Sequence, residues 1–164
     1  MTGRSPVVLL IAILIAITVS SCDTQEQQND FATEASLPPK GFTSTNSVGD
    51  IISEDENDWR TSPIYFGKVR ISPLYPNPES VDFVTLPINI LQFDAAQSGF
   101  TLRANDGTLN NLILLDRMTD ITGPGGYIMR FSPAVLGRSG LVRIFVFDSV
   151  NEIVSYGDLM ISGK

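Results

Sequence analysis

The side chains of this chain that could do chemistry are few in kind. The sequence contains no histidine and a single cysteine, Cys22. Histidine is the commonest catalytic base and a frequent metal ligand, and Ser-His-Asp or Cys-His arrangements require it. A lone cysteine also excludes an intrachain disulfide and a thiolate zinc site. We therefore predict neither a metal site nor a cofactor.

Carboxylates are the remaining candidates for acid–base chemistry. Two of them, one acid and one base or nucleophile, can hydrolyse a glycosidic bond. Most acids after residue 58 fall in predicted turns, where they are expected to bond the backbone. An acidic run at 54–58 lacks the alternating oxygens and the glycine of a calcium loop. We expect a protein that is not an enzyme, with a paired-carboxylate hydrolase as an alternative, and we expect Asp158 to pair with an arginine on a neighbouring strand.

The amino-terminal residues give Cys22 its context. Residues 7–19 carry no charge and follow Arg4 closely. As a helix this run would span about 20 Å, whereas a bilayer core of about 30 Å needs about 20 residues. The pattern predicts a signal peptide over residues 1–21 rather than a transmembrane helix. The run ends in an aliphatic residue, two small residues and the cysteine, Val19-Ser20-Ser21-Cys22.

This tetrapeptide resembles the lipobox of bacterial lipoprotein precursors. The resemblance implies diacylglycerol transfer to the thiol of Cys22, cleavage after Ser21 and acylation of the new amino terminus. Two or three acyl chains anchor a protein stably, so the membrane is an expected partner. A plain secretory peptide or an uncleaved anchor is the alternative. The expected location is the envelope of a Gram-negative-type bacterium, and we favour the outer membrane, although Asp23 also resembles an inner-membrane retention signal of enteric bacteria.

The acidity of the chain is concentrated after the cysteine. Residues 22–58 hold nine acids and one base, a net charge of −8, whereas residues 59–164 hold nine of each. The first stretch is polar and shows no sustained helical or strand period. Low hydrophobicity with high net charge predicts disorder. We expect residues 22–58 to form a flexible tether with a reach of roughly 30–37 Å.

Residues 59–164 have the pattern of a β domain. Short apolar runs alternate with turn residues, and seven strands are predicted, near residues 64–72, 82–93, 100–104, 108–115, 127–131, 141–147 and 153–161. Seven short strands in about 100 residues are typical of an antiparallel sandwich. We predict an all-β immunoglobulin- or fibronectin-like fold, with a jelly roll or small barrel as the alternative. Pro87 favours an edge or bulged strand for 82–93, and the apolar run 141–147 favours a central strand. Ser132-Pro133 and Gly137 predict a single helical turn between them, and Asn105-Asp106-Gly107 predicts a hairpin turn.

Two stretches of this domain resemble known families. Tyr75-Pro76-Asn77-Pro78 is similar to the start of carboxy-terminal sorting domains of the type IX secretion system, which are also small β-sandwiches. Together with Asp58-Trp59-Arg60-Thr61 and Ser155-Tyr156-Gly157-Asp158, it resembles uncharacterised small lipoproteins of the Bacteroidetes–Rhodothermota kind. That second resemblance implies no activity.

Binding is the function class that the remaining residues favour. A net charge of −7 argues against nucleic acid as a partner. Trp59, Tyr75 and Tyr127 could contact a partner protein or stack on sugars. We predict a lipid-anchored, non-enzymatic interaction or assembly module with an envelope protein as its partner, and glycan binding as the alternative.

Overall fold

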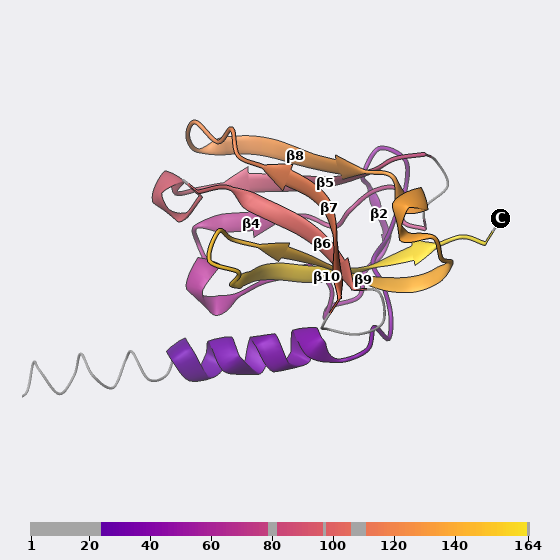
Figure 1. The fold of residues 1–164 in the computed structure, drawn as a ribbon, viewed down its shortest axis with the longest axis horizontal. Coiled ribbons are helices and arrows are strands. Elements are labelled where there is room, and N and C mark those ends of the chain that lie inside the picture. Colours follow the sequence, from indigo (N-terminus) through magenta and orange to yellow (C-terminus); the bar gives the residue numbers. More distant parts are fainter. Residues whose placement is uncertain (1–23, 79–81, 97, 106–110, 164) are drawn as a thin grey trace, which may run out of the picture.

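The computed structural model describes residues 24–78, 82–96, 98–105 and 111–163, which form two packed antiparallel sheets preceded by a helix (Figure 1). Cys22 and the predicted signal peptide lie outside the described residues. The larger sheet has the strand order β3 (Arg60–Thr61), β10 (Ile153–Ile161), β9 (Gly140–Phe147), β6 (Phe100–Asn105) and β7 (Leu112–Met118). The smaller sheet has the order β4 (Val69–Ile71), β5 (Val84–Ile90) and β8 (Gly125–Phe131).

The strand order identifies the sandwich. Of the seven strands from β4 onward, the first, second and fifth form one sheet, and the fourth, third, sixth and seventh form the other. In a constant-type immunoglobulin domain the fourth strand joins the first sheet. Here β7 pairs with β6 instead, which is the fibronectin-like variant of the same Greek-key sandwich. The predicted all-β, immunoglobulin- or fibronectin-like fold is therefore confirmed.

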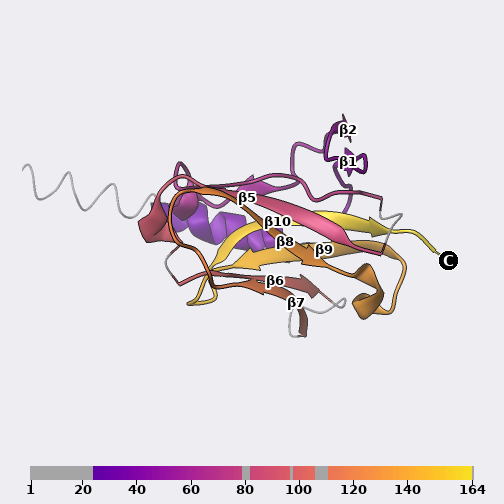
Figure 2. The same cartoon turned by 90° about the horizontal axis from the view of Figure 1, so that it is seen from above.

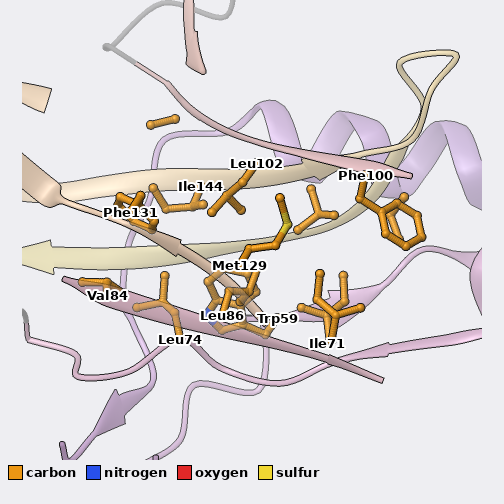
Figure 3. Packing of buried hydrophobic residues seen from close by; sticks show 14 of the residues in the cluster. Trp59, Ile71, Leu74, Val84, Leu86, Phe100, Leu102, Met129, Phe131 and Ile144 are labelled. Carbon is orange, nitrogen blue, oxygen red and sulfur yellow. The ribbon is translucent and has the colours of Figure 1, made fainter. Parts of the chain in front are cut away.

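The core forms where the alternating apolar residues of the two sheets meet (Figure 3). Leu86 of β5, Leu102 of β6 and Met129 of β8 are fully buried in it. Strand β9 is buried on both faces, with Ile144 in this core and Phe145 on the opposite side. Burial on two faces explains the near-continuous apolar run at 141–147, and its predicted central position is confirmed, because β9 lies between β10 and β6.

The helix, residues 24–36, covers the outer face of the larger sheet. Phe31 and Ala35, four residues apart and so on one face of the helix, are 6% and 1% exposed. They pack on three aromatic rings of that outer face, Phe145, Phe147 and Tyr156. Figure 1 shows the helix running alongside β9 and β10. The described part of the predicted tether thus begins with an ordered helix, which forms a third layer on the two sheets, rather than with flexible chain.

The rest of this stretch, residues 37–58, which we call the strap, is also ordered. It contains a hairpin of β1 (Ser44–Thr45) and β2 (Ile51–Ser53) that stands out from the sandwich in Figure 2. Asn77, which is fully buried, donates hydrogen bonds to the carbonyls of Thr43 and Asp158. Its side-chain oxygen accepts from the N–H of Met160. The prediction of a flexible tether over 22–58 is therefore wrong from residue 24 onward, because contacts with distant residues replace the local pattern that the stretch lacks.

Pro87 lies in the middle strand of the smaller sheet, so its predicted edge or bulge position is wrong. β5 pairs with β4 on one side and with β8 on the other. The carbonyl of Pro87 accepts a hydrogen bond from Ser72, one residue past the end of β4. The backbone nitrogen of Pro87, which carries no proton, therefore faces the chain just beyond the end of β4. No hydrogen bond of the β4–β5 ladder needs a donor at that point.

Two local turn predictions have different outcomes. The predicted helical turn at 132–137 is confirmed, since η3 (Pro133–Leu136) ends at Gly137 with a left-handed φ of 60°. The predicted Asn105-Asp106-Gly107 turn falls between β6 and β7 in the sequence, and these two strands pair as antiparallel neighbours, but the turn itself stays a prediction. Residues 106–110 lie outside the described residues.

Candidate functional site

The most buried charges of the described chain form one ion pair on the outer face of the larger sheet. Arg143 and Asp158 lie directly opposite each other on β9 and β10. The Nε and Nη2 atoms of Arg143 each donate to one carboxylate oxygen of Asp158 at 2.8 Å. The two residues are 8% and 4% exposed. The prediction that Asp158 pairs with an arginine of a neighbouring strand is confirmed.

The same guanidinium binds the end of the helix. Nη1 of Arg143 donates to the carbonyl oxygens of Glu34, Ala35 and Leu37 at 3.2, 3.2 and 2.9 Å. The last carbonyls of a helix have no partner within it, and a cation is favourable there. Arg143 therefore both neutralises Asp158 and fastens the helix to the sheet.

Asp58 joins the following segment to this pair. Its two carboxylate oxygens accept the backbone N–H groups of Asp158 at 2.7 Å and Thr43 at 2.8 Å. Burial raises the pKa of Asp58 from its ordinary 3.8 to about 7, although the hydrogen bond from Thr43 opposes the rise and the charge of Asp158 adds to it. We call Arg143, Asp158 and Asp58 the polar junction.

Tyr156 and Arg60 complete the surroundings of the junction. The Arg143 guanidinium lies 4.8 Å from the centre of the Tyr156 ring, which also contacts the ring of Phe31. Arg60 donates to the Tyr156 hydroxyl and pairs with Glu34 of the helix. Helix, strap and sheet therefore share one set of charged and aromatic contacts.

A hollow of about 200 Å³ opens beside the polar junction. Its walls include Asp58, Asp158 and Asp55, the kind of carboxylates that acid–base chemistry would use. Each carboxylate oxygen of Asp58 and of Asp158, however, already accepts a hydrogen bond from within the protein. This arrangement suits attachment of the amino-terminal segment better than proton transfer to a ligand. In the part of the chain that the structure describes, no group of three or more Cys, Asp or Glu side chains could hold a metal ion.

The three aromatic residues predicted as contact sites are separated. Trp59 is 5% exposed and lies in the core near Leu86 (Figure 3), with its ring packed on Gly157. It therefore offers no face to a partner or a glycan. Tyr75 is half-buried against Gly49 of the hairpin. Tyr127 is half-buried on β8, and its hydroxyl donates to the carbonyl of Gly123 at 2.8 Å. The open stacking platform that the glycan alternative requires is not formed by these rings.

The sequence interpretation missed an exposed apolar feature of the described chain. Val48, Ile51 and Ile52 of the β1–β2 hairpin are 72%, 49% and 70% exposed. The turn between them is ordered, because the Asn46 side-chain oxygen accepts the N–H groups of Val48 and Asp50. We call Val48, Ile51 and Ile52 the apolar hairpin. The adjacent isoleucines in an otherwise polar stretch were a visible signal, but the prediction of a tether left them without a role.

Comparisons with known proteins find distant likeness. No family model and no curated protein matches the chain. An LPMO from Kitasatospora papulosa is 18% identical with a TM-score of 0.31, and the match covers 54% of this chain and about half (52%) of that protein. An immunoglobulin-like protein from Pseudomonas aeruginosa is 11% identical with a TM-score of 0.33, over 58% of this chain and 97% of that one. The fold assignment given above rests on the strand order.

Proposed function

We propose that this protein is a lipid-anchored, non-enzymatic module of the cell envelope that holds a partner protein through the apolar hairpin. The observation that carries the proposal is the ordered display of Val48, Ile51 and Ile52 on a projecting hairpin. Exposed apolar side chains on an ordered, projecting element are typical of protein-interaction sites. The bridge between Thr45 and Asn77 ties the hairpin to the sandwich, so these side chains are presented rigidly.

The anchoring part of the proposal is supported by the sequence. The tetrapeptide Val19-Ser20-Ser21-Cys22 resembles a lipobox, and the only cysteine of the chain occupies its last position. Among the described residues, no helix combines the length and the apolar character needed to cross a bilayer. The non-enzymatic part is supported by the internal hydrogen bonds that occupy the carboxylates of Asp58 and Asp158.

Site-specific photo-cross-linking in intact cells tests this function. A photoreactive amino acid is placed at Ile52 of the apolar hairpin or, as a matched control, at Ile128 of β8, which are 70% and 60% exposed. We expect a discrete cross-linked envelope protein from position 52 that is lost in the Val48→Ser/Ile51→Ser background. The intact mass of the purified protein should show loss of residues 1–21 and gain of lipid on Cys22.

Three results would contradict the proposal. Identical products at both positions would show that the hairpin is not selective. The absence of a cross-linked product at position 52 would show that no partner protein binds the hairpin. A product with the mass of two copies of this protein would show that the hairpin binds a second copy of the chain. An unmodified Cys22 thiol would remove the lipid anchor, independently of the cross-linking result.

A further inference from the structure

The start of the helix lies very close in sequence to the proposed lipid. The structure describes the chain from residue 24, two positions after Cys22. Two residues of fully extended chain span at most about 7 Å. If Cys22 carries lipid, as the proposed function states, the first turn of the helix must lie near the membrane surface. The inference below rests on that proposed anchor.

The helix cannot swing freely about this point, because both its side and its end are fixed. Phe31 packs against the ring of Tyr156 with 5.1 Å between ring centres. Arg143 holds the carbonyls at the helix end. Since the helix is docked on the sandwich, the position of its first residue determines which end of the domain faces the bilayer.

Strand register identifies that end. Arg143 and Asp158 lie beside the last residues of the helix, whereas the pair Phe147 and Ile153 lies toward its start. Three loops meet there: residues 62–68, 91–96 and 148–152. The hydroxyl of Tyr65 donates to Asp148 at 2.6 Å, and the N–H of Leu91 donates to the carbonyl of Lys68. Figure 1 shows these loops at the end of the domain where the helix starts, opposite the carboxyl terminus.

Each of the three loops exposes a large apolar side chain. Phe66 is 82% exposed, Val150 is 73% exposed and Leu91 is 43% exposed. A monomeric protein gains nothing in water from three such side chains on neighbouring loops. At a membrane they can enter the boundary between headgroups and acyl chains. We propose that Phe66, Leu91 and Val150 form a membrane-contact surface that sets the lipidated domain upright on the bilayer.

The charges around this surface favour a zwitterionic bilayer. Lys68 is accompanied by Asp94, Glu152 and Asp148. Asp148 accepts hydrogen bonds from Tyr65 and from two backbone N–H groups of its own loop, so its charge is partly compensated. The remaining acidic excess is repelled by anionic lipid. Contact therefore depends on apolar insertion. The apolar hairpin lies at the opposite end of the domain from the start of the helix (Figure 2), so in this orientation it faces away from the membrane.

Quenching by brominated acyl chains tests this orientation. The protein as the cell produces it is reconstituted into phosphatidylcholine vesicles with brominated chains, as Phe66→Trp, Val150→Trp or, as the control, Val48→Trp. Trp59 contributes the same background in all three, because it is 5% exposed. We expect quenching of the tryptophan at 66 and at 150 to exceed that at 48 by about twofold or more. Equal quenching at the three positions, or stronger quenching at 48, overturns the proposal.

The intact mass of the same samples separates this inference from the lipid anchor. If Cys22 carries lipid and positions 66 and 150 are not quenched, the membrane-contact surface is wrong and the anchor stands. If the thiol is free, the anchor is wrong, and the mature chain is coupled through that thiol to a maleimide lipid before the measurement is repeated. Quenching at 66 and 150 then supports the surface, and its absence overturns it.

Discussion

The amino-terminal segment, residues 24–58, and the sandwich, residues 59–161, are held in the fold by different means. The sandwich is held by strand pairing and by a hydrophobic core to which both sheets contribute side chains. The segment buries two apolar side chains, Phe31 and Ala35, against the sheet and otherwise depends on polar contacts. It carries eight acids and one base, whereas residues 59–164 are balanced. A strongly charged stretch can therefore be ordered by a few well-placed partners.

The largest effect in this comparison is expected for Arg143, which belongs to the sandwich but holds the segment. Arg143→Met leaves the carboxylate of Asp158 buried without a charge partner and frees the carbonyls of the helix end. Breaking a buried pair in this way costs about 3–5 kcal/mol. Urea unfolding should report this loss for the whole domain.

A double variant and a surface control sharpen that result. Arg143→Met combined with Asp158→Leu should recover much of the lost free energy of unfolding, because replacing both partners by apolar residues is often neutral. Arg138→Met, at an exposed arginine, should change it by no more than about 0.5 kcal/mol. A loss of similar size for Arg138→Met would mean that the buried pair has no special role.

A smaller and more local effect is expected for Phe31. Phe31→Ala removes the main apolar contact of the helix with Tyr156 and the aromatic outer face. In a fixed core such a change costs about 3–5 kcal/mol. Here the helix can detach while the sandwich stays folded. The loss of stability caused by Phe31→Ala should therefore not exceed the free energy with which the helix docks on the sheet, which is smaller.

Hydrogen exchange distinguishes the two regions in this variant. Amides of residues 24–36 should exchange faster, while those of β6 and β9 keep the protection of the parent protein. The matched change is Leu86→Ala in the sandwich core, which should lower protection in both regions, by about 2–5 kcal/mol. If Phe31→Ala lowered protection in β6 as much as in the helix, the two regions would be one cooperative unit.

The last expected effect depends on pH and comes from the ionisation of Asp58. Its pKa is raised by burial to about 7 in the folded protein from an ordinary value of 3.8. A folded-state pKa above the unfolded value means that the contribution to stability is fully present below pH 3.8 and is lost as the pH rises through about 7. The attachment of residues 37–58 should therefore weaken between about pH 4 and pH 7.

Asp58→Asn measures this contribution. The variant should be less stable at low pH, because an amide nitrogen cannot accept the second of the two backbone N–H groups. Its urea midpoint should nevertheless fall less steeply with pH than that of the parent protein. Burial raises the pKa of Asp158 as well, against the opposing hydrogen bond from Arg143, so the difference between the two proteins isolates Asp58. Parallel pH profiles would show that Asp58 titrates normally.

Local sequence patterns determined the sandwich itself. The alternation of Phe100, Leu102 and Ala104, and the apolar run at 141–147, predicted strands that the structure contains. Proline at the start and glycine at the end of 133–137 predicted a helical turn that is present. These features were predictable because strand alternation and turn chemistry act between residues near in sequence. Pairing of Asp158 with an arginine was predictable because Asp158 falls within the predicted strand 153–161, and Arg143 is the one polar residue in the apolar run of the predicted strand 141–147.

Tertiary structure alone decided that residues 24–58 are ordered and that Trp59 is buried. The helix is held by Arg143, more than 100 residues away, and the strap by Asn77 and Asp158. No local period records such contacts, so composition pointed to disorder. Trp59 is drawn into the core because Gly157 leaves room for its ring. The sequence by itself determined which segments form sheets, and contacts between distant residues decided how the acidic segment docks on them and which side chains stay exposed.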